Sequence, residues 1–375
     1  MQKNTSFREK PFYNYYVQED MTDFWKQHRH SHQKVLFICG IGFSPRCTPA
    51  LKAMVNVIER GSSFTVLCAR FINSMDKNLV NNYESALDNL DIIRDAADSV
   101  PDGIRHEIEV NLFDSEEKQI GDAMLIREFD EAVGSQLPHY TDIVVDVSAY
   151  PRSMMYTLIG HLWKKRKDEQ NLFNLFAVLT QTPGSDPSTP EDFIDISYVQ
   201  GDKHRRRKGD QVWVPILGEK NILRMDAIYD FLKPVEIFPL VPFPDLNPRR
   251  GDSLLTDYRD TIFGKWQVPF ENIMYASGTV PWDVFRKLSD FAELHKSKEN
   301  TSLVISAMAG RTISIGALLA ALHHDLYICH IQPADYIMSP EDRAKILSEC
   351  ERAEITLYWL AGSLYDDIPP EGARE

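Results

Sequence analysis

The sequence lacks the features of a membrane protein and of a disulfide-stabilised one. No stretch reaches about 18 consecutive apolar residues, and the polar, aromatic N-terminus has no signal-peptide core. The five cysteines are an odd number and include no C-x-x-C pair, and basic residues are outnumbered 41 to 55, for a net charge of -14. We therefore expect a soluble cytoplasmic protein with reduced thiols, no membrane partner and no broad basic surface for nucleic acid.

Several signatures of enzymes and cofactor sites are also missing. The sequence contains no G-x-x-x-x-G-K-[ST] run, no G-x-S-x-G elbow and no H-E-x-x-H motif. Gly40 and Gly42 follow a strand-like run, but Pro45 stands where a dinucleotide fingerprint has its third glycine. No acidic residue ends the second strand either, so we exclude an NAD-type site. We predict no metal site, and the sequence identifies no cofactor.

Alternating strand-like and helix-like segments indicate the fold class. From Lys34 onward, short apolar runs alternate with longer segments of helical period, which predicts an α/β fold with a Rossmann-like, doubly wound and mostly parallel sheet. A chain of 375 residues with 43% apolar content can form two lobes, or one large sheet with an insertion. The five strands of the first sheet are expected at residues 35–41, 64–69, 105–112, 142–147 and 172–179.

We divide the chain into four parts. Residues 1–33 form an N-terminal arm, and residues 34–180 form the Rossmann-like ligand-binding domain. Residues 181–234 are a loop and β-hairpin insertion, in which residues 194–199 pair with 211–216 around the basic run 203–208. Residues 235–375 form a second α/β section, and whether part of it is a separate domain stays open.

One loop pattern occurs twice and indicates a ligand site. Residues 146–154 (DVSAYPRSM) and 306–316 (SAMAGRTISIG) each follow a β-branched run, contain one arginine and lead into an apolar helix. At the carboxyl end of a parallel strand, the next helix offers unpaired N–H groups and a partial positive charge. The pattern therefore indicates an anionic ligand such as a nucleotide. Apart from this loop, the sequence shows no internal repeat.

An assumed strand order of 3-2-1-4-5 places these residues at a crevice. The loops after the first and fourth strands then flank the topological switch point, with Arg46 and Arg152 on opposite sides and Ser44 and Ser148 between them. The alternative pairs each arginine with a nearby carboxylate, Asp146 or Asp142. The full set of candidate ligand-binding residues is Gly40, Gly42, Ser44, Arg46, Ser148, Arg152, Arg249, Arg250, Gly310 and Arg311.

The sequence contains no coherent set of catalytic residues. Asp146 ends a strand in the best crevice, so it is a candidate acid/base or metal-bound carboxylate; equally, it could cap the turn that follows. Cys47 lies at a helix start, where a thiolate would be stabilised, but no histidine can be assigned as its base. A buried structural thiol is the favoured interpretation of Cys47.

The loop that begins at Asp146 resembles the signature loop of CARF-type Rossmann-like domains, the cyclic-oligonucleotide sensors of prokaryotic defence systems. Asp146, Ser148, Arg152 and Met154 match that loop, whereas residues 149–151 (AYP) replace its usual glycines. The resemblance implies a Rossmann-like fold, a cyclic oligonucleotide or related nucleotide as ligand, and a homodimer with the ligand across its interface.

Three functions are compatible with this pattern. The leading hypothesis is a sensor or regulatory subunit that binds a nucleotide-like anion, works with a protein partner and belongs to a prokaryotic anti-phage defence system. The second is a metal-dependent enzyme acting on a phosphorylated nucleotide or nucleoside, with Asp146 as acid/base. The third is a protein-interaction module without a small-molecule ligand, in which the N-terminal arm and the run 203–208 bind a partner.

Overall fold

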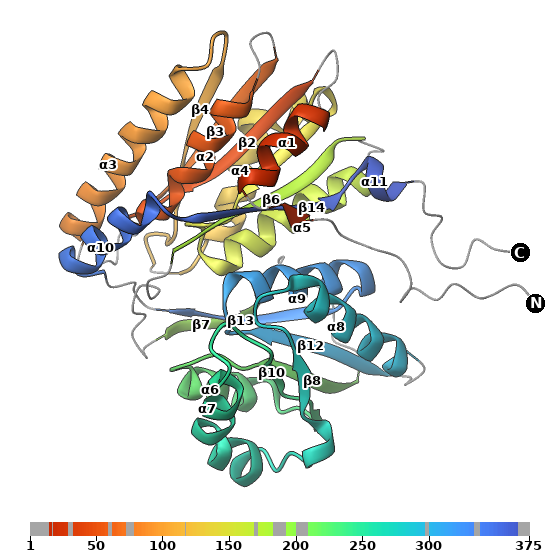
Figure 1. Ribbon diagram of the computed structural model, residues 1–375. Helices are drawn as coiled ribbons and strands as arrows, with labels where there is room; N and C mark the ends of the chain where they lie inside the picture. Colours follow the sequence, from red (N-terminus) through yellow and green to blue (C-terminus); the bar gives the residue numbers. More distant parts are fainter. Residues whose placement is uncertain are drawn as a thin grey trace, which may run out of the picture. The chain divides into compact units, whose positions relative to one another are not determined.

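The chain folds into two compact units, shown as a ribbon in Figure 1. The computed structural model describes residues 15–16, 18–28, 33–58, 62–72, 79–116, 118–168, 172–182, 193–199, 209–296, 300–333 and 338–366. The first unit contains the described residues up to 182 together with those from 338 onward. The second unit contains the described residues from 193 to 333.

The first unit is built on a seven-stranded sheet of order β1-β14-β6-β5-β2-β3-β4. Its five parallel strands are β2 (Lys34–Ile41), β3 (Ser63–Ile72), β4 (Ile104–Asn111), β5 (Asp142–Asp146) and β6 (Asn174–Gln181). Numbered along the chain, they lie in the order 3-2-1-4-5, which confirms the strand order assumed from the sequence. Beyond β6, strand β14 (Glu354–Ala361) pairs antiparallel with β6, and strand β1 (Tyr15–Tyr16) pairs antiparallel with β14.

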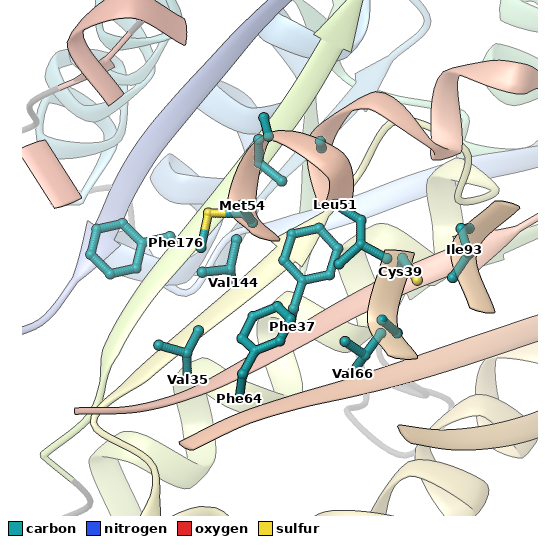
Figure 2. Packing of buried hydrophobic residues seen from close by; sticks show 14 of the residues in the cluster. Val35, Phe37, Cys39, Leu51, Met54, Phe64, Val66, Ile93, Val144 and Phe176 are labelled. Carbon is teal, nitrogen blue, oxygen red and sulfur yellow. The ribbon is translucent and has the colours of Figure 1, made fainter. Parts of the chain in front are cut away.

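Helices cover this sheet, and their apolar faces complete its core. They are α1 (Gln18–His28), α2 (Pro49–Val57), α3 (Leu79–Asp98), α4 (Gly121–Val133), α5 (Arg152–Asp168), α10 (Pro340–Cys350) and α11 (Ser363–Asp366). Strand β2 is buried from its second residue to its last, as expected for a central strand with both faces covered. Figure 2 shows Phe37 of β2 beside Phe64 of β3, with Leu51 and Met54 of α2 packed over them.

The second unit contains another seven-stranded sheet. Its parallel strands are β8 (Asp210–Ile216), β10 (Leu240–Pro242), β11 (Met274–Ala276), β12 (Thr301–Ala307) and β13 (Tyr327–Pro333), with β9 (Glu236–Ile237) beside β8. Strand β7 (Phe193–Tyr198) pairs antiparallel with β13 at the edge. The helices are α6 (Ile222–Leu232), α7 (Arg250–Asp257), α8 (Pro281–His295) and α9 (Arg311–His324). The α/β fold class is therefore present in both units.

The two units share one topology. The order β11-β10-β8-β12-β13-β7 is again 3-2-1-4-5 with an antiparallel sixth strand next to the fifth, as in β4-β3-β2-β5-β6-β14. The sequence shows no repeat beyond the arginine loop, whereas the structure repeats the strand order. Two units can have this strand order without similar sequences, because such a sheet requires the pattern of buried apolar residues and not particular residues.

The sixth strands are exchanged between the units. Strand β7 follows β6 in the chain but pairs with β13, and β14 follows β13 but pairs with β6 (Figure 1). Strand β8 lies between β10 and β12, so the predicted hairpin of residues 194–199 with 211–216 is wrong. Pairing is decided by which sheet edge is open, because the backbone hydrogen bonds themselves are alike at either edge. The basic run 203–208, predicted at the hairpin tip, lies outside the described residues.

The predicted second α/β section, residues 235–375, is divided between the two units, because β14 pairs with β6 of the first unit. In the predicted N-terminal arm, α1 packs on the first unit, and the side chains of Met21 and Trp25 are only 1% exposed. Within the part of the chain that the structure describes, no helix has both the length and the apolarity that a membrane crossing requires.

Candidate functional site

The loop after β5 is organised by Asp146. This carboxylate is 1% exposed, and its Oδ1 atom accepts hydrogen bonds from the backbone N–H (2.9 Å) and the hydroxyl group of Ser148. The Ser148 oxygen in turn accepts the N–H of Thr180 on β6 at 2.8 Å. Asp146 and Ser148 therefore fix the turn and tie it to the neighbouring strand. This arrangement is the capping role given as the alternative to a catalytic carboxylate.

Gly40, near the end of β2, allows close packing against that loop. A Cβ atom at Gly40 would lie 2.8 Å from the Phe71 ring and 2.9 Å from the Tyr150 ring. Tyr150, one of the residues that replace glycines of the CARF pattern, is fully buried and meets Phe71 edge to face at 5.2 Å. Its ring therefore occupies the space over the carboxyl end of β2, and Gly40 is required for that packing.

Arg46 and Arg152 both belong to the first unit and to the two loops that flank its switch point. Arg46 lies in the short helix η2 (Pro45–Cys47), is 7% exposed, and donates from Nε to the Thr182 hydroxyl at 2.9 Å. Arg152 is the first residue of α5 and is partly exposed. The carboxylate of Asp142, a suggested partner, instead bonds with His28 at 2.7 Å and Gln33 at 3.1 Å.

Ser44 contributes a hydroxyl group to the same loop. It precedes η2, but its side chain makes no cap hydrogen bond, and its buried Oγ atom has no partner among the described residues. A buried hydroxyl without a partner costs about 1–3 kcal/mol. Ser44 is therefore a donor or acceptor that a ligand at this loop would satisfy.

The equivalent loops of the second unit touch one another. A Cβ atom at Gly218, after β8, would lie 2.1 Å from the carbonyl oxygen of Met308, after β12. Asn221 donates to that same carbonyl at 3.2 Å, and Tyr258 donates to the carbonyl of Gly218 at 2.9 Å. In the first unit, Asn89 of α3 donates to the carbonyl of Gly42 at 2.8 Å. The sequence analysis did not identify these supporting residues. The signal that could have indicated them is Gly218, a glycine that follows an apolar strand, as Gly42 does in the first unit.

Arg311 and Gly310 lie at the start of α9. Gly310 is the residue before the helix, and Arg311 is its first residue, so Arg311 has the position in the second unit that Arg152 has in the first. The hydroxyls of the same segment have internal partners. Ser306 accepts from the Trp213 indole at 3.1 Å, and Ser314 donates to the Gly310 carbonyl at 3.1 Å.

Of the adjacent residues Arg249 and Arg250, Arg250 forms ion pairs and Arg249 is exposed. Arg250 contacts Asp245 at 3.1 Å and Glu219 at 3.2 Å, so intramolecular ion pairs account for it. Glu219 lies in the loop after β8, which brings Arg250 next to the second switch point. Arg249 precedes α7 and is exposed. These arginines and Arg311 belong to the second unit, whereas Arg46 and Arg152 belong to the first.

The buried thiols and the acidic side chains give little support to catalysis. Burial raises the pKa of the Cys47 thiol well above its ordinary value. A hydrogen bond with Cys68, and then burial, raises the pKa of Cys39 in the same way. Both thiols are therefore protonated at neutral pH and weak nucleophiles. Among the described residues, no group of three or more His, Cys, Asp or Glu side chains is arranged to hold a metal ion.

No family model matches the chain, and the search of the curated proteins gives no match. What can be said of the site therefore depends on its own geometry.

Proposed function

We propose that the protein is a sensor or regulatory subunit that binds a nucleotide-like anion at the loops after the first and fourth strands. The observation that carries the proposal is the shared position of Arg152 and Arg311. Each is the first residue of the helix after the fourth strand, in two units that have the same strand order.

Helix and side chain both favour an anion at this position. The first turn of α5 or α9 offers N–H groups and a partial positive charge, and arginine adds a planar group suited to phosphate or carboxylate. In the first unit, the buried hydroxyl of Ser44 adds a group without a partner among the described residues. The net charge of the chain is -14, so these loops would attract an anion locally, not through a general positive field.

A sensor agrees with the chemistry of the site better than an enzyme does. The Asp146 carboxylate bonds with Ser148 inside its own turn, and the nearby thiols have raised pKa values. The resemblance of the loop at Asp146 to CARF-type sensors supports a cyclic oligonucleotide or related nucleotide as ligand. It also supports a role in prokaryotic anti-phage defence, with the protein acting as a homodimer and with a protein partner.

The test is a thermal-shift and titration series with mono-, di- and cyclic nucleotides, in which each mixture is analysed for products. A ligand at about 100 times its Kd stabilises the folded state by about 2.7 kcal/mol. The shift should be reduced in Arg152→Ala and Arg311→Ala. It should remain in Arg286→Ala, an exposed arginine on α8 with a 56% exposed side chain.

The outcomes separate the three functions. Stabilisation without turnover supports the sensor, and consumption of the nucleotide assigns the protein to the enzyme class. The absence of any shift across the series would overturn the proposal and favour the interaction module.

A further inference from the structure

A cavity of about 310 Å³ opens in the first unit beside the candidate anion loop. It lies between the loop after β2, helix α3 and the start of α10, which are near one another in Figure 1. Its size is that of a small-ligand pocket. The lining residues that matter for its chemistry are Phe43, Glu84, Asp88, Met338, Arg343 and Leu347.

One ion pair holds the two helices together across this cavity. Arg343 of α10 donates to Asp88 of α3 through Nη2 and Oδ2 at 3.0 Å. A carboxylate has two oxygens with about four acceptor sites, so this bond leaves Asp88 able to accept further hydrogen bonds. Its side chain is 65% exposed, so a ligand can reach it. Glu84 lies one helical turn before Asp88 on the same face of α3.

The lining suits a heterocyclic base and disfavours a phosphate. Two carboxylates and one guanidinium line the cavity, so their net negative charge repels an anion, and the carboxylates accept hydrogen bonds from N–H donors. Phe43, Met338 and Leu347 supply apolar and aromatic surface on which a flat ring can lie. Phe43 is next in sequence to Ser44, so the cavity and the proposed anion loop adjoin.

We infer that this cavity binds the base of the nucleotide whose phosphate binds at the loops after β2 and β5, an inference that rests on the proposed function. Asp88 and Glu84 accept hydrogen bonds from an amino group on the base, and Phe43 contacts its ring. The site prefers guanine to hypoxanthine and cytosine to uracil, because each second base lacks the amino group of the first. Uracil has a carbonyl oxygen in place of the amino group, which would face an acceptor-only carboxylate, and hypoxanthine has only a C–H group there.

The experiment compares Kd values for GTP with ITP and for CTP with UTP, by calorimetry on the full chain, with pyrophosphate as the probe without a base. The preference for the amino-bearing base should be roughly 10- to 100-fold, as expected for a hydrogen bond to a charged group. Asp88→Asn should reduce it to about twofold or less, because the amide adds a donor. Phe43→Ala should weaken all four nucleotides and leave pyrophosphate unchanged.

The control variant is Asp91→Asn. Asp91 lies on α3 with a 73% exposed side chain and pairs with Arg94, away from the residues that line the cavity. It should keep the base preference, whereas Arg152→Ala should weaken the four nucleotides and pyrophosphate alike.

Each outcome decides between the two proposals. If the nucleotides bind and depend on Arg152 but show no amino preference, or if Asp88→Asn leaves the preference intact, the base site is wrong and the anion site stands. If neither the nucleotides nor pyrophosphate bind, the proposed function fails and the base site fails with it.

Discussion

Arg152 and Arg311 are equivalent residues of two structurally repeated units, each the first residue of the helix that follows the fourth strand. The equivalence extends to the loops after the first strands. The carbonyl of Gly42 accepts a hydrogen bond from Asn89, and the carbonyl of Gly218 accepts one from Tyr258. In each unit, the residue that donates this hydrogen bond lies after the second strand. In both units, a polar side chain therefore supports the loop after the first strand.

Replacement of Arg152 or Arg311 should weaken ligand binding more than replacement of an exposed arginine elsewhere in the chain. Arg152→Ala or Arg311→Ala should weaken binding of a nucleotide by roughly 10- to 100-fold, because a charge-assisted hydrogen bond is lost. Replacement by lysine should recover only part of the loss, since the ammonium cannot bind two oxygens in a planar geometry. Calorimetric titration of the variants measures this, and equal affinity of wild type and Arg152→Ala would remove Arg152 from the site.

Gly40 should be required for the packing of Tyr150. In Gly40→Ala the new methyl group meets two aromatic rings at less than 3.0 Å, so we expect a loss of about 1–3 kcal/mol in the free energy of unfolding. Gly42→Ala is the matched control, because its Cβ atom meets its nearest neighbour at 3.9 Å. Denaturant titration gives both values.

A double-mutant cycle identifies the ring responsible. In a Tyr150→Leu background the cost of Gly40→Ala should fall, since the branched side chain leaves space that the ring occupied. An unchanged cost would show that Phe71 alone, or the backbone, limits residue 40.

Asp142 should stabilise the first unit in a pH-dependent way. Burial alone would raise its pKa, but hydrogen bonds from His28, Thr141 and Asn174 outweigh burial and hold the pKa below its ordinary value. For a carboxyl group whose folded-state pKa is lowered, the stabilisation is present above the unfolded-state pKa. It is lost as the pH falls through the folded-state pKa.

Asp142→Asn should therefore cost about 2–3 kcal/mol at pH 7 and progressively less in acid. The matched control is Asp130→Asn, which removes another His–Asp pair, with His161 at 2.9 Å, but at a carboxylate that is 37% exposed. That change should cost about 1 kcal/mol or less. Urea unfolding between pH 3 and 7 tests both, and a pH-independent difference for Asp142→Asn would contradict the charged state assigned to Asp142.

The strand exchange can be tested by local stability. Leu357 of β14 is fully buried in the core of the first unit, so Leu357→Ala should cost about 2–5 kcal/mol. Amide hydrogen exchange should then quicken in β6, its hydrogen-bonded neighbour, more than in β13, which precedes it in the chain. Leu294→Ala, at a 74% exposed position on α8, serves as the control. Loss of protection concentrated in β13 would contradict the pairing of β14 with β6.

The sequence by itself determined the alternation of strands and helices and the parallel core. Buried parallel strands are covered on both faces, so they appear as apolar runs such as that of β2, and short loops with glycine or proline separate them from helices. The order 3-2-1-4-5 could be assumed because it is a usual order of doubly wound sheets. This order predicts that Arg46 and Arg152 lie in neighbouring loops.

Tertiary structure alone decided the exchange of β7 and β14 and the roles of several side chains. A strand joins a sheet mainly through backbone groups that nearly all residues share, so its sequence alone does not specify which sheet it joins. Tyr150 was a departure from a glycine pattern in the sequence, and only packing assigned its ring to the space above Gly40. The sequence left Asp146 either a candidate acid/base or a cap of the next turn, and only the fold showed that its Oδ1 atom accepts hydrogen bonds from Ser148 in that turn.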